Sequence, residues 1–589
     1  MRLSWTSEVP GQGPLREQWN ALVLQMKKPE VFFTWEWASA VARAYGDVLS
    51  PWIATAYEGD ELVGVAALAK PSSREAVFLA GTTADYCDFI SRPVLRQEFA
   101  RQVLRDLKKD GVRRVTLANL PADSATIAGL RGNGCFYSYA RTAYVCAQVR
   151  LGSEEERQML VQSLMKKKML RRALNSLERA GPASLRHECG MGLRDASLNA
   201  FFPMHVARFL SMGRISNLVA PERRRFLVEL ARLLGEREWI DLMSLCVGNR
   251  VLAYNYGFRF HGSWFWYQPT LDNEFEELSP GFCLLAKIVE DACRHPEVQE
   301  VDLGLGAEGY KERFANAQRT TLHVTLCRSV LKSWLAGGRF LAAESIKKRR
   351  KLESIARRAQ WGMRRGQQRV AEHGLVRTLV WAGRRLRRTF ASKDEVRLFR
   401  WQGDGQTSEQ SERLVPLSWE ILAAAAMRYA QDRETLDYLL RSSERFRSAT
   451  HRGYALLVPN GVAMHFAWVA PYEGFAMAEL QEILRAPSPE SVMIFDCWTP
   501  RELRGRGLYG RAVQQLATLL RTEGKEAWIF SAAANPASLA GLGRTGFESQ
   551  FSLVRRKILW WARTWTKQST EYRSTASPKP AVPTSPYGE

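Results

Sequence analysis

The stretch Val492–Leu520, which reads VMIFDCW, TPRELRGRGLYG and RAVQQLATLL, decides how this chain is expected to fold. An apolar run of strand length is followed by a turn made of glycine and arginine. Apolar residues then recur with helical spacing at Leu508, Ala512, Leu516 and Leu520. The stretch therefore predicts a strand, a tight turn and a helix.

The turn has the composition of a phosphate-binding site. Gly505, Gly507 and Gly510 remove side chains where a ligand must approach the backbone closely. The free N–H groups and the positive dipole end of the following helix favour a phosphate, and Arg504 and Arg506 add positive charge beside it. The alternative is a surface turn that is simply rich in glycine and arginine.

The same turn resembles the acyl-CoA signature of the GCN5-related N-acetyltransferase (GNAT) superfamily, Arg/Gln-x-x-Gly-x-Gly/Ala. The matching residues are Arg504, Gly505, Arg506, Gly507, Leu508 and Tyr509, with Gly510 directly after them. Tyr509 departs from the last small position of the signature. The resemblance implies a GNAT fold after Asp394 and an acyl-CoA bound by residues 504–510.

Two further residues of this region are candidates. The resemblance implies that Asn535, before a short helix ending in Gly546-Phe547, lies beside the CoA pantetheine, although Asn followed by Pro536 is also ordinary helix capping. Asp496, near the end of the strand before the turn, is a candidate general base if burial raises its pKa. A turn-capping role for Asp496 is the alternative.

Size and composition limit the classes of protein. At 589 residues the chain is too long for one core, and 46% hydrophobic residues suffice for several packed ones. The start of the chain lacks the pattern of a secretory signal, and no apolar run reaches the length of a membrane span. Nine scattered Cys and eight isolated His show no metal-ligand spacing, so we expect reduced thiols, a cytoplasmic location and no metal.

The positive charge is concentrated in one segment. Residues 331–393 contain 18 Lys or Arg and three acidic residues, which accounts for +15 of the formal net charge of +23. The pattern predicts two tandem α/β units at 1–150 and 151–330, a basic helical linker at 331–393, and an α/β domain at 394–566. A disordered tail rich in Ser, Thr and Pro is expected at 567–589.

A second constellation lies in the middle of the chain, at Asp302-Leu303-Gly304-Leu305-Gly306-Ala307-Glu308-Gly309-Tyr310-Lys311. It satisfies G-x-G-x-x-G, but no long helix or ribose-binding acid follows, which excludes a dinucleotide site. The segment resembles the Asp-x-x-x-Gly-x-x-x-Tyr-Lys pattern of the CelD/BioF2-like acetyltransferases, relatives of the FemAB peptidyltransferases with two GNAT-like units in tandem. The likeness extends over most of 30–326 and includes the ADYCDF patch at 84–89; Phe314 stands where a tryptophan often follows.

This resemblance implies further site residues. Asp302 is a candidate base at a strand end, and Lys311, next to Tyr310, is a candidate for binding a carboxylate or phosphate or for stabilising the transferring acyl group. Ser279 and Gly281 flank Pro280 at a helix start and are candidates for the CoA pyrophosphate. The alternative makes Asp302 a structural acceptor, Tyr310 a packing residue and Lys311 a solvated cation.

The sequence thus predicts an acyl-CoA-dependent N- or O-acyltransferase. Acetyl or another acyl group would pass directly from the thioester to an amine or hydroxyl of a sugar, an amino acid or a cell-envelope, polysaccharide or lipid precursor. No Ser-His-Asp or Cys-His set is apparent. Two alternatives remain: aminoacyl transfer from charged tRNA, as in FemAB proteins, and a non-catalytic scaffold at a membrane.

A further hypothesis concerns the basic linker. Between Glu372 and Phe390, leucines and arginines recur at near-helical intervals on different sides. Such a helix would either pack on its own domains or lie on the anionic inner face of a membrane. The second possibility would make the enzyme peripheral to that membrane.

Overall fold

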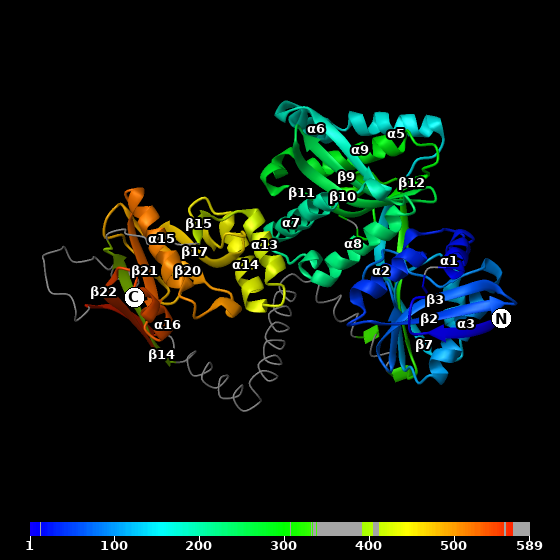
Figure 1. Cartoon of the computed structure of the whole chain (residues 1–589), viewed down its shortest axis with the longest axis horizontal. Coiled ribbons are helices and arrows are strands. Elements are labelled where there is room, and N and C mark those ends of the chain that lie inside the picture. The colour runs from blue at the N-terminus through cyan, green and yellow to red at the C-terminus, as the bar shows by residue number, and fades with distance from the viewer. Residues whose placement is uncertain are drawn as a thin grey trace. The chain divides into compact units, whose positions relative to one another are not determined.

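The computed structural model describes residues 1–11, 13–306, 308–331, 333, 337–338, 391–403, 412–558 and 561–568. The chain divides into two compact units, Met1–Arg208 with Asn217–Arg349 and Phe209–Ser216 with Arg350–Glu589. Each unit has its own β-sheet (Figure 1). Most of the predicted basic linker, including 372–390, and residues 569–589 of the predicted tail lie outside the described residues.

The first unit contains a 13-stranded sheet in the order β1-β2-β3-β4-β6-β13-β7-β12-β11-β10-β9-β8, with β5 paired to β3. Its strands are β1 (Arg2–Thr6), β2 (Ser50–Glu58), β3 (Glu61–Ser72), β4 (Glu75–Phe78), β5 (Ile90–Ser91), β6 (Arg114–Pro121), β7 (Tyr137–Arg150), β8 (Ala183–Cys189), β9 (Ile240–Val247), β10 (Arg250–Phe260), β11 (Ser263–Leu271), β12 (Glu300–Asp302) and β13 (Ala317–Cys327). Its helices are α1 (Pro14–Leu24), α2 (Trp35–Tyr45), α3 (Arg96–Lys109), α4 (Thr126–Arg131), α5 (Glu154–Lys166), α6 (Lys168–Ala180), α7 (Asp195–Ser211, whose last residues fall in the second unit), α8 (Pro221–Gly235) and α9 (Pro280–Ala292).

The two predicted halves repeat one arrangement, a strand followed by a helix and a parallel strand. In the first half β4 and β6 are parallel and α3 connects them, whereas in the second half β11 and β12 are parallel and α9 connects them. Both helices bury their apolar residues. The mixed α/β fold expected from the sequence is confirmed.

One strand of the second half lies in the sheet of the first. Strand β13 falls within the predicted second unit, 151–330, but it pairs with β6 on one side and with β7 along its whole length on the other. Strand β7 in turn pairs with β12. The two halves therefore share one continuous sheet, because the last strand finds its hydrogen-bond partners in the first half.

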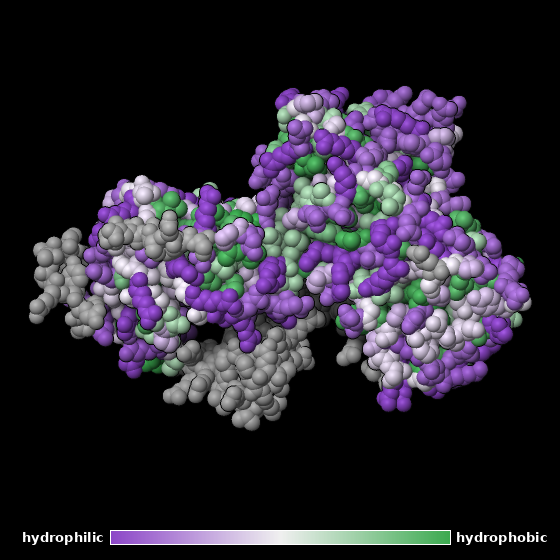
Figure 2. Space-filling model, in the orientation of Figure 1, coloured by the Kyte–Doolittle hydropathy of each residue, from purple (hydrophilic) through white to green (hydrophobic). Residues whose placement is uncertain are grey.

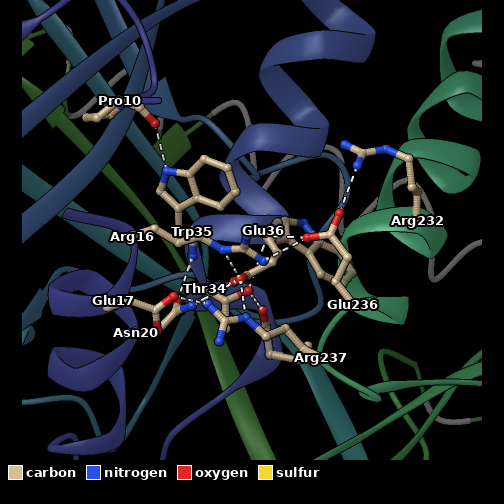
Figure 3. Close-up of polar contacts among 12 residues, drawn as sticks. Pro10, Arg16, Glu17, Asn20, Thr34, Trp35, Glu36, Arg232, Glu236 and Arg237 are labelled. Carbon is tan, nitrogen blue, oxygen red and sulfur yellow. Dashed lines mark hydrogen bonds and ion pairs between the residues drawn. The ribbon is translucent and has the colours of Figure 1, made fainter. Parts of the chain in front are cut away.

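A buried carboxylate also joins the halves (Figure 3). Glu36 of α2 is fully buried; it accepts hydrogen bonds from Arg16 at 2.8 Å and Asn20 at 2.9 Å, and from Arg237, which follows α8, at 3.2 Å. Arg16 also bonds Glu236 across the same contact. A buried charge needs such partners, so this network holds α2 against the end of α8.

The second unit contains an eight-stranded sheet in the order β15-β16-β17-β20-β21-β14-β22-β23, and a separate pair, β18-β19. Its strands are β14 (Ala391–Trp401), β15 (Arg413–Pro416), β16 (Arg452–Leu457), β17 (Ala463–Pro471), β18 (Ala476–Met477), β19 (Glu482–Ile483), β20 (Ser491–Trp498), β21 (Glu526–Ala532), β22 (Phe547–Ile558) and β23 (Trp561–Gln568). Its helices are α13 (Trp419–Arg428), α14 (Arg433–Phe446), α15 (Leu508–Thr522) and α16 (Pro536–Leu542).

The predicted strand, turn and helix at Val492–Leu520 are β20, a tight turn and α15, which leads into the parallel strand β21. Leu508, Ala512, Leu516 and Leu520 are all buried on one side of α15. The sequence range of the sheet extends beyond the predicted domain bounds, 394–566, in both directions. Strand β14 begins three residues before the predicted domain, and β23 includes Lys567 and Gln568, the first two residues of the predicted tail.

Within the described residues, no helix combines the length and the apolarity needed to cross a bilayer. Figure 2 shows a visible face that is mostly hydrophilic, with hydrophobic residues scattered among the polar ones.

Candidate functional site

A cleft in the second unit opens where two parallel strands separate. The pairing of β20 with β21 stops at Ile494 and Ile529, although both strands continue beyond that point. At the same place β20 carries a bulge against β17, and Asp496 takes a left-handed backbone conformation with φ of 44°. The cleft has a volume of about 1120 Å³.

The cleft brings together most of the site residues predicted in this region. The predicted residues that line it are Asp496, Arg504, Gly505, Gly507, Leu508, Tyr509, Gly510 and Asn535. Arg506 is not among the lining residues; it is exposed, and its guanidinium donates to the backbone oxygen of Glu502 at 3.5 Å. The resemblance therefore located the cleft, while one of its arginines lies outside it.

Glycine is needed at the three positions of the turn for different structural reasons. Gly505 and Gly507 have φ of 81° and 74°, and a Cβ added to either would meet no neighbour within 4 Å. Both are needed for the backbone conformation. Gly507 is also the N-cap of α15 and has no side-chain cap, so no side chain blocks access to the first N–H groups of the helix. Gly510 instead lets α15 lie close to the segment after α16, because an added Cβ would lie 3.2 Å from Thr545 Cγ2.

Asp496 and Arg504 are held by neighbours at the mouth of the cleft. The carboxylate of Asp496 forms an ion pair with Arg445, and the Tyr438 hydroxyl donates to its backbone oxygen at 3.1 Å. Arg504 lies over the ring of Trp498, 4.9 Å from the ring centroid, and donates to Thr499 O at 3.1 Å. Both side chains remain partly exposed to solvent.

Tyr509 and Asn535, which both line the cleft, are connected through Ser538 of α16. Asn535 caps α16 by accepting the Ser538 N–H at 3.2 Å, and the Ser538 hydroxyl donates to the Tyr509 oxygen at 3.1 Å. The large ring at position 509 is accommodated by Gly541 of α16, where an added Cβ would lie 2.6 Å from the ring. Burial raises the pKa of Tyr509, which keeps its hydroxyl neutral.

His465 of β17 also lines the cleft and was missed by the sequence analysis. It is 1% exposed; Nδ1 lies 2.8 Å from Thr499 Oγ1, and Nε2 has no hydrogen-bond partner among the described residues. Burial lowers its pKa to about 3, so the imidazole is neutral. A single His in the apolar strand sequence VAMHFAWVA gave no signal beyond that of a core residue.

The second candidate centre lies in the first unit around Asp302, at the end of β12. Asp302 is fully buried and accepts three hydrogen bonds: from Tyr86 Oη at 2.8 Å, from Gln148 Nε2 at 2.7 Å and from the N–H of Gly304 at 2.8 Å. This arrangement matches the alternative in which Asp302 is a structural acceptor.

Asp85 is the carboxyl group that the sequence analysis missed here. It lies in the ADYCDF patch, and a Cβ added to Gly304 would be only 2.7 Å from its Oδ2. Burial, followed by the nearby charge of Asp302, raises the pKa of Asp85 to about 7 against the opposing effects of Lys311 and Arg223. Unlike Asp302, it is partly exposed. A carboxyl group with such a pKa can exchange a proton near neutral pH.

The other predicted residues of this centre are placed by local contacts. Lys311 is buried, donates to Leu305 O at 3.1 Å and pairs with Glu308 at 2.6 Å. Tyr310 accepts a hydrogen bond from the Trp266 indole at 3.1 Å, and burial raises the pKa of its hydroxyl. Lys311 is thus not the solvated cation of the alternative.

Ser279 and Gly281 stand at the start of α9, as predicted. Ser279 is the N-cap in a left-handed conformation with φ of 53°, and it makes no side-chain cap. A Cβ added to Gly281 would contact Leu271 at 3.4 Å, which is ordinary packing. This helix start follows the parallel strand β11 as the turn at 504–510 follows β20.

A buried ion pair connects the two halves of the first unit beside Asp302. Glu30, before α2, is fully buried and pairs with Arg319 of β13, whose guanidinium lies 4.5 Å from the centre of the Tyr86 ring. Burial raises the pKa of Glu30 to about 8 despite that partner. Glu30, Arg319, Tyr86 and Asp302 form one polar chain between the halves.

One group of possible metal ligands is present among the described residues. The spacing of His and Cys along the sequence did not predict this group. Atoms of His187, Cys189 and Asp241 lie within 4.8 Å of one another. Arg259 already supplies a cation there, because it donates to Cys189 Sγ at 2.8 Å and pairs with Asp241 at 3.2 Å. The hydrogen bond to Asp241 contributes most to raising the pKa of His187 to about 10.

Comparisons with known proteins identify one part of the chain. Residues 165–312 match a family model described as an acetyltransferase (GNAT) domain. No curated protein matches the sequence. Among solved structures, the chain is similar to FemX at 9% identity (55% of this chain, 97% of that chain, TM-score 0.40), to L-PGS from Bacillus licheniformis at 12% (53%, 97%, 0.36), and to a tandem GNAT protein from the clavulanic acid biosynthesis pathway at 12% (55%, 98%, 0.34).

The family match includes the helix start at Ser279 and the whole segment from Asp302 to Lys311. It also includes the parallel strands β11 and β12 with the connecting helix α9. The chain is therefore an acyltransferase that carries a GNAT domain in residues 165–312.

Proposed function

We propose that the second unit binds an acyl-CoA, acetyl-CoA first of all, in the cleft between β20 and β21. The observation that carries this proposal is the cleft itself, which opens where the two parallel strands separate and ends at the uncapped start of α15. The CoA pyrophosphate would bind the N–H groups that follow Gly507, and Arg504 would supply positive charge beside it.

The transfer needs no covalent enzyme intermediate. An amine or hydroxyl of the acceptor attacks the thioester carbon, the carbon–sulfur bond breaks, and the CoA thiolate leaves. Asp496, partly exposed at the end of β20, accepts the proton that the acceptor loses, and Arg445 holds its carboxylate in place. The acceptor class proposed from the sequence is a sugar, an amino acid or an envelope or lipid precursor.

The GNAT domain of the first unit would carry a second transfer centre. There Asp85 replaces Asp302 as the proposed proton acceptor, because Asp302 already accepts three hydrogen bonds from the protein and is fully buried. The partly exposed Asp85 has a pKa of about 7, and Lys311 lies close enough to influence it. Ser279 and Lys311 remain the proposed anion-binding residues of this centre.

Calorimetry of the full chain with acetyl-CoA tests the cleft. Gly507→Leu should abolish heat from the second-unit site, because the side chain disturbs the backbone that faces the pyrophosphate. Gly461→Leu is a matched control: Gly461 has φ of 80° and equally open surroundings, and it does not line the cleft. If both variants bind acetyl-CoA like the unmodified chain, the proposed site is wrong.

A further inference from the structure

The hairpin of β22 and β23 forms the edge of the second unit's sheet, and one of its faces has an unusual composition. Strand β22 is labelled in Figure 1 and is coloured near the red, C-terminal end of the scale. Across the hairpin Ile558 pairs with Trp561, Arg556 with Arg563, and Val554 with Trp565. Side chains alternate along a strand, so one face presents Arg556, Ile558, Trp561, Arg563, Trp565 and Lys567, together with the buried Val554 and Ser552 opposite the last two. We call this set the tryptophan–arginine face.

The opposite face of the hairpin is occupied by the protein. Arg555 donates to the backbone oxygen of Leu480, and the Thr564 hydroxyl donates to Glu482 at 2.6 Å. These two residues pair with each other across the hairpin and point away from the tryptophan–arginine face. The hairpin is therefore anchored on one side.

The tryptophan–arginine face is open to solvent. Trp561 is 53% exposed, Ile558 44% and Trp565 38%. Large apolar side chains at this exposure are ordinary when isolated, but three of them on one short hairpin form a patch that favours a partner.

The cations of this face have no partners among the described residues. Arg556, Arg563 and Lys567 make no ion pair or hydrogen bond there, and Lys393 of β14, in register with Arg556, makes none either. The acidic residue that the register places on this face is Glu395, opposite Val554. The face is thus basic and aromatic together, and its charges are available to an anionic partner.

We propose that the tryptophan–arginine face docks on an anionic phospholipid bilayer. Tryptophan prefers the boundary between headgroups and acyl chains, and arginine and lysine bind lipid phosphates. From the turn end of the hairpin the face presents Ile558 with Trp561, then Arg556 with Arg563, then Trp565 and then Lys567, so apolar and cationic side chains alternate along it. A face on which apolar and cationic side chains alternate can place tryptophan at the headgroup boundary and cations on the neighbouring lipid phosphates at the same time. The proposal does not depend on the acyl-CoA site.

Co-sedimentation of the full chain with vesicles tests the proposed membrane docking. Vesicles of phosphatidylcholine with 30% phosphatidylglycerol should bind the protein, whereas pure phosphatidylcholine should not, and salt should weaken binding. Replacing Arg556, Arg563 and Lys567 together with Gln should weaken binding about 100-fold, from about fivefold for each cation. Trp561→Ser with Trp565→Ser should weaken it at least about tenfold.

A matched variant controls for net charge. Arg447, Arg485 and Arg544 are exposed cations of the same unit that make no ion pair among the described residues and do not line the cleft. Replacing them with Gln removes the same charge and should change vesicle binding by less than about fivefold. Bromine-labelled lipid should quench tryptophan fluorescence in the unmodified chain and quench less in the double tryptophan variant.

Three results of the vesicle experiment would contradict the proposal. The proposal is wrong if the face variants bind vesicles like the unmodified chain, or if the control variant loses as much binding as they do. It is also wrong if Arg384, Arg385, Arg387 and Arg388 replaced by Gln account for all vesicle binding. Loss of single-stranded RNA binding without loss of vesicle binding in the face variants would assign the face to nucleic acid instead.

Discussion

Two carboxyl groups that lie close together in the first unit have opposite surroundings. Asp302 is buried and receives three hydrogen bonds from the protein. Asp85 lies beside Gly304, is partly exposed and has a pKa of about 7. Environment, rather than residue type, therefore separates a positioning group from a group able to carry a proton.

The raised pKa of Asp85 predicts a pH-dependent effect on stability. The folded state holds the proton up to about pH 7, whereas an unfolded Asp releases it near pH 4, so this group's stabilising contribution is lost as pH rises between those values. Asp85→Asn mimics the protonated form. It should raise the free energy of unfolding more at pH 8 than at pH 5, as measured by urea denaturation; an equal change at both pH values would contradict the assignment.

In the second unit the residue to test is Asp496. Asp496→Asn keeps the shape of the side chain but removes its ability to accept a proton. We expect kcat for acyl transfer to fall by about 10²- to 10⁴-fold with little change in the dissociation constant of acetyl-CoA. Arg445→Gln, which removes the partner of the carboxylate, should lower kcat less. An unchanged kcat in the Asp496 variant would exclude it as the base.

At the scale of the elements, α2 and α8 hold the halves of the first unit together. Trp37 of α2 packs edge-on against Phe226 of α8, with ring centroids 5.5 Å apart. Glu36 beside it gathers Arg16, Asn20 and Arg237 in a buried network. The apolar contact supplies the burial, and the carboxylate fixes how the helices meet.

Removing this carboxylate should therefore be costly. Glu36→Ala removes the carboxylate that accepts from Arg16, Asn20 and Arg237 in the buried network, and it should lower the free energy of unfolding by about 3 kcal/mol. The control is Glu229→Gln on α8, which breaks the exposed ion pair with Arg43 and should cost less than about 1 kcal/mol. Urea denaturation measures the free energy of unfolding of both variants. Equal decreases would show that the buried network stabilises the fold no more than the exposed ion pair does.

At the scale of the whole molecule, the chain forms two compact units, and the first is a single sheet made from two repeats. Strand β13 runs between β6 and β7, so residues 1–150 by themselves lack a central strand of their own sheet. Unpaired strand edges at that position expose backbone groups and buried apolar residues to solvent.

Fragment 1–150 should consequently be unfolded or aggregated, whereas fragment 1–331, which contains β13, should fold. Circular dichroism and size-exclusion chromatography of the two fragments provide the measurement. Adding a peptide that spans 315–329 to fragment 1–150 should improve its solubility, because the peptide can occupy the vacant position of β13. A soluble, cooperatively folded 1–150 would contradict the shared-sheet arrangement.

Sequence alone determined the local features of this protein. The strand, turn and helix at Val492–Leu520 could be predicted because apolar spacing and positive-φ glycines act over a few residues. The candidate residues Asp496, Gly505 and Gly507 came from the same local pattern and Asn535 from the family resemblance, and all four line one cleft. The position of Arg506 outside the cleft could not be predicted from the sequence, because it depends on how the turn folds.

Only the tertiary structure decided what lies next to what. The place of β13, the approach of Asp85 to Gly304, and His465 in the cleft wall all join residues far apart in the chain. Strand β7 shows the reason: an alternating pattern says which side chains face the core, but not which strand will satisfy its backbone hydrogen bonds. The tryptophan–arginine face likewise emerged from cross-strand register, since its residues are one group only when β22 and β23 are paired.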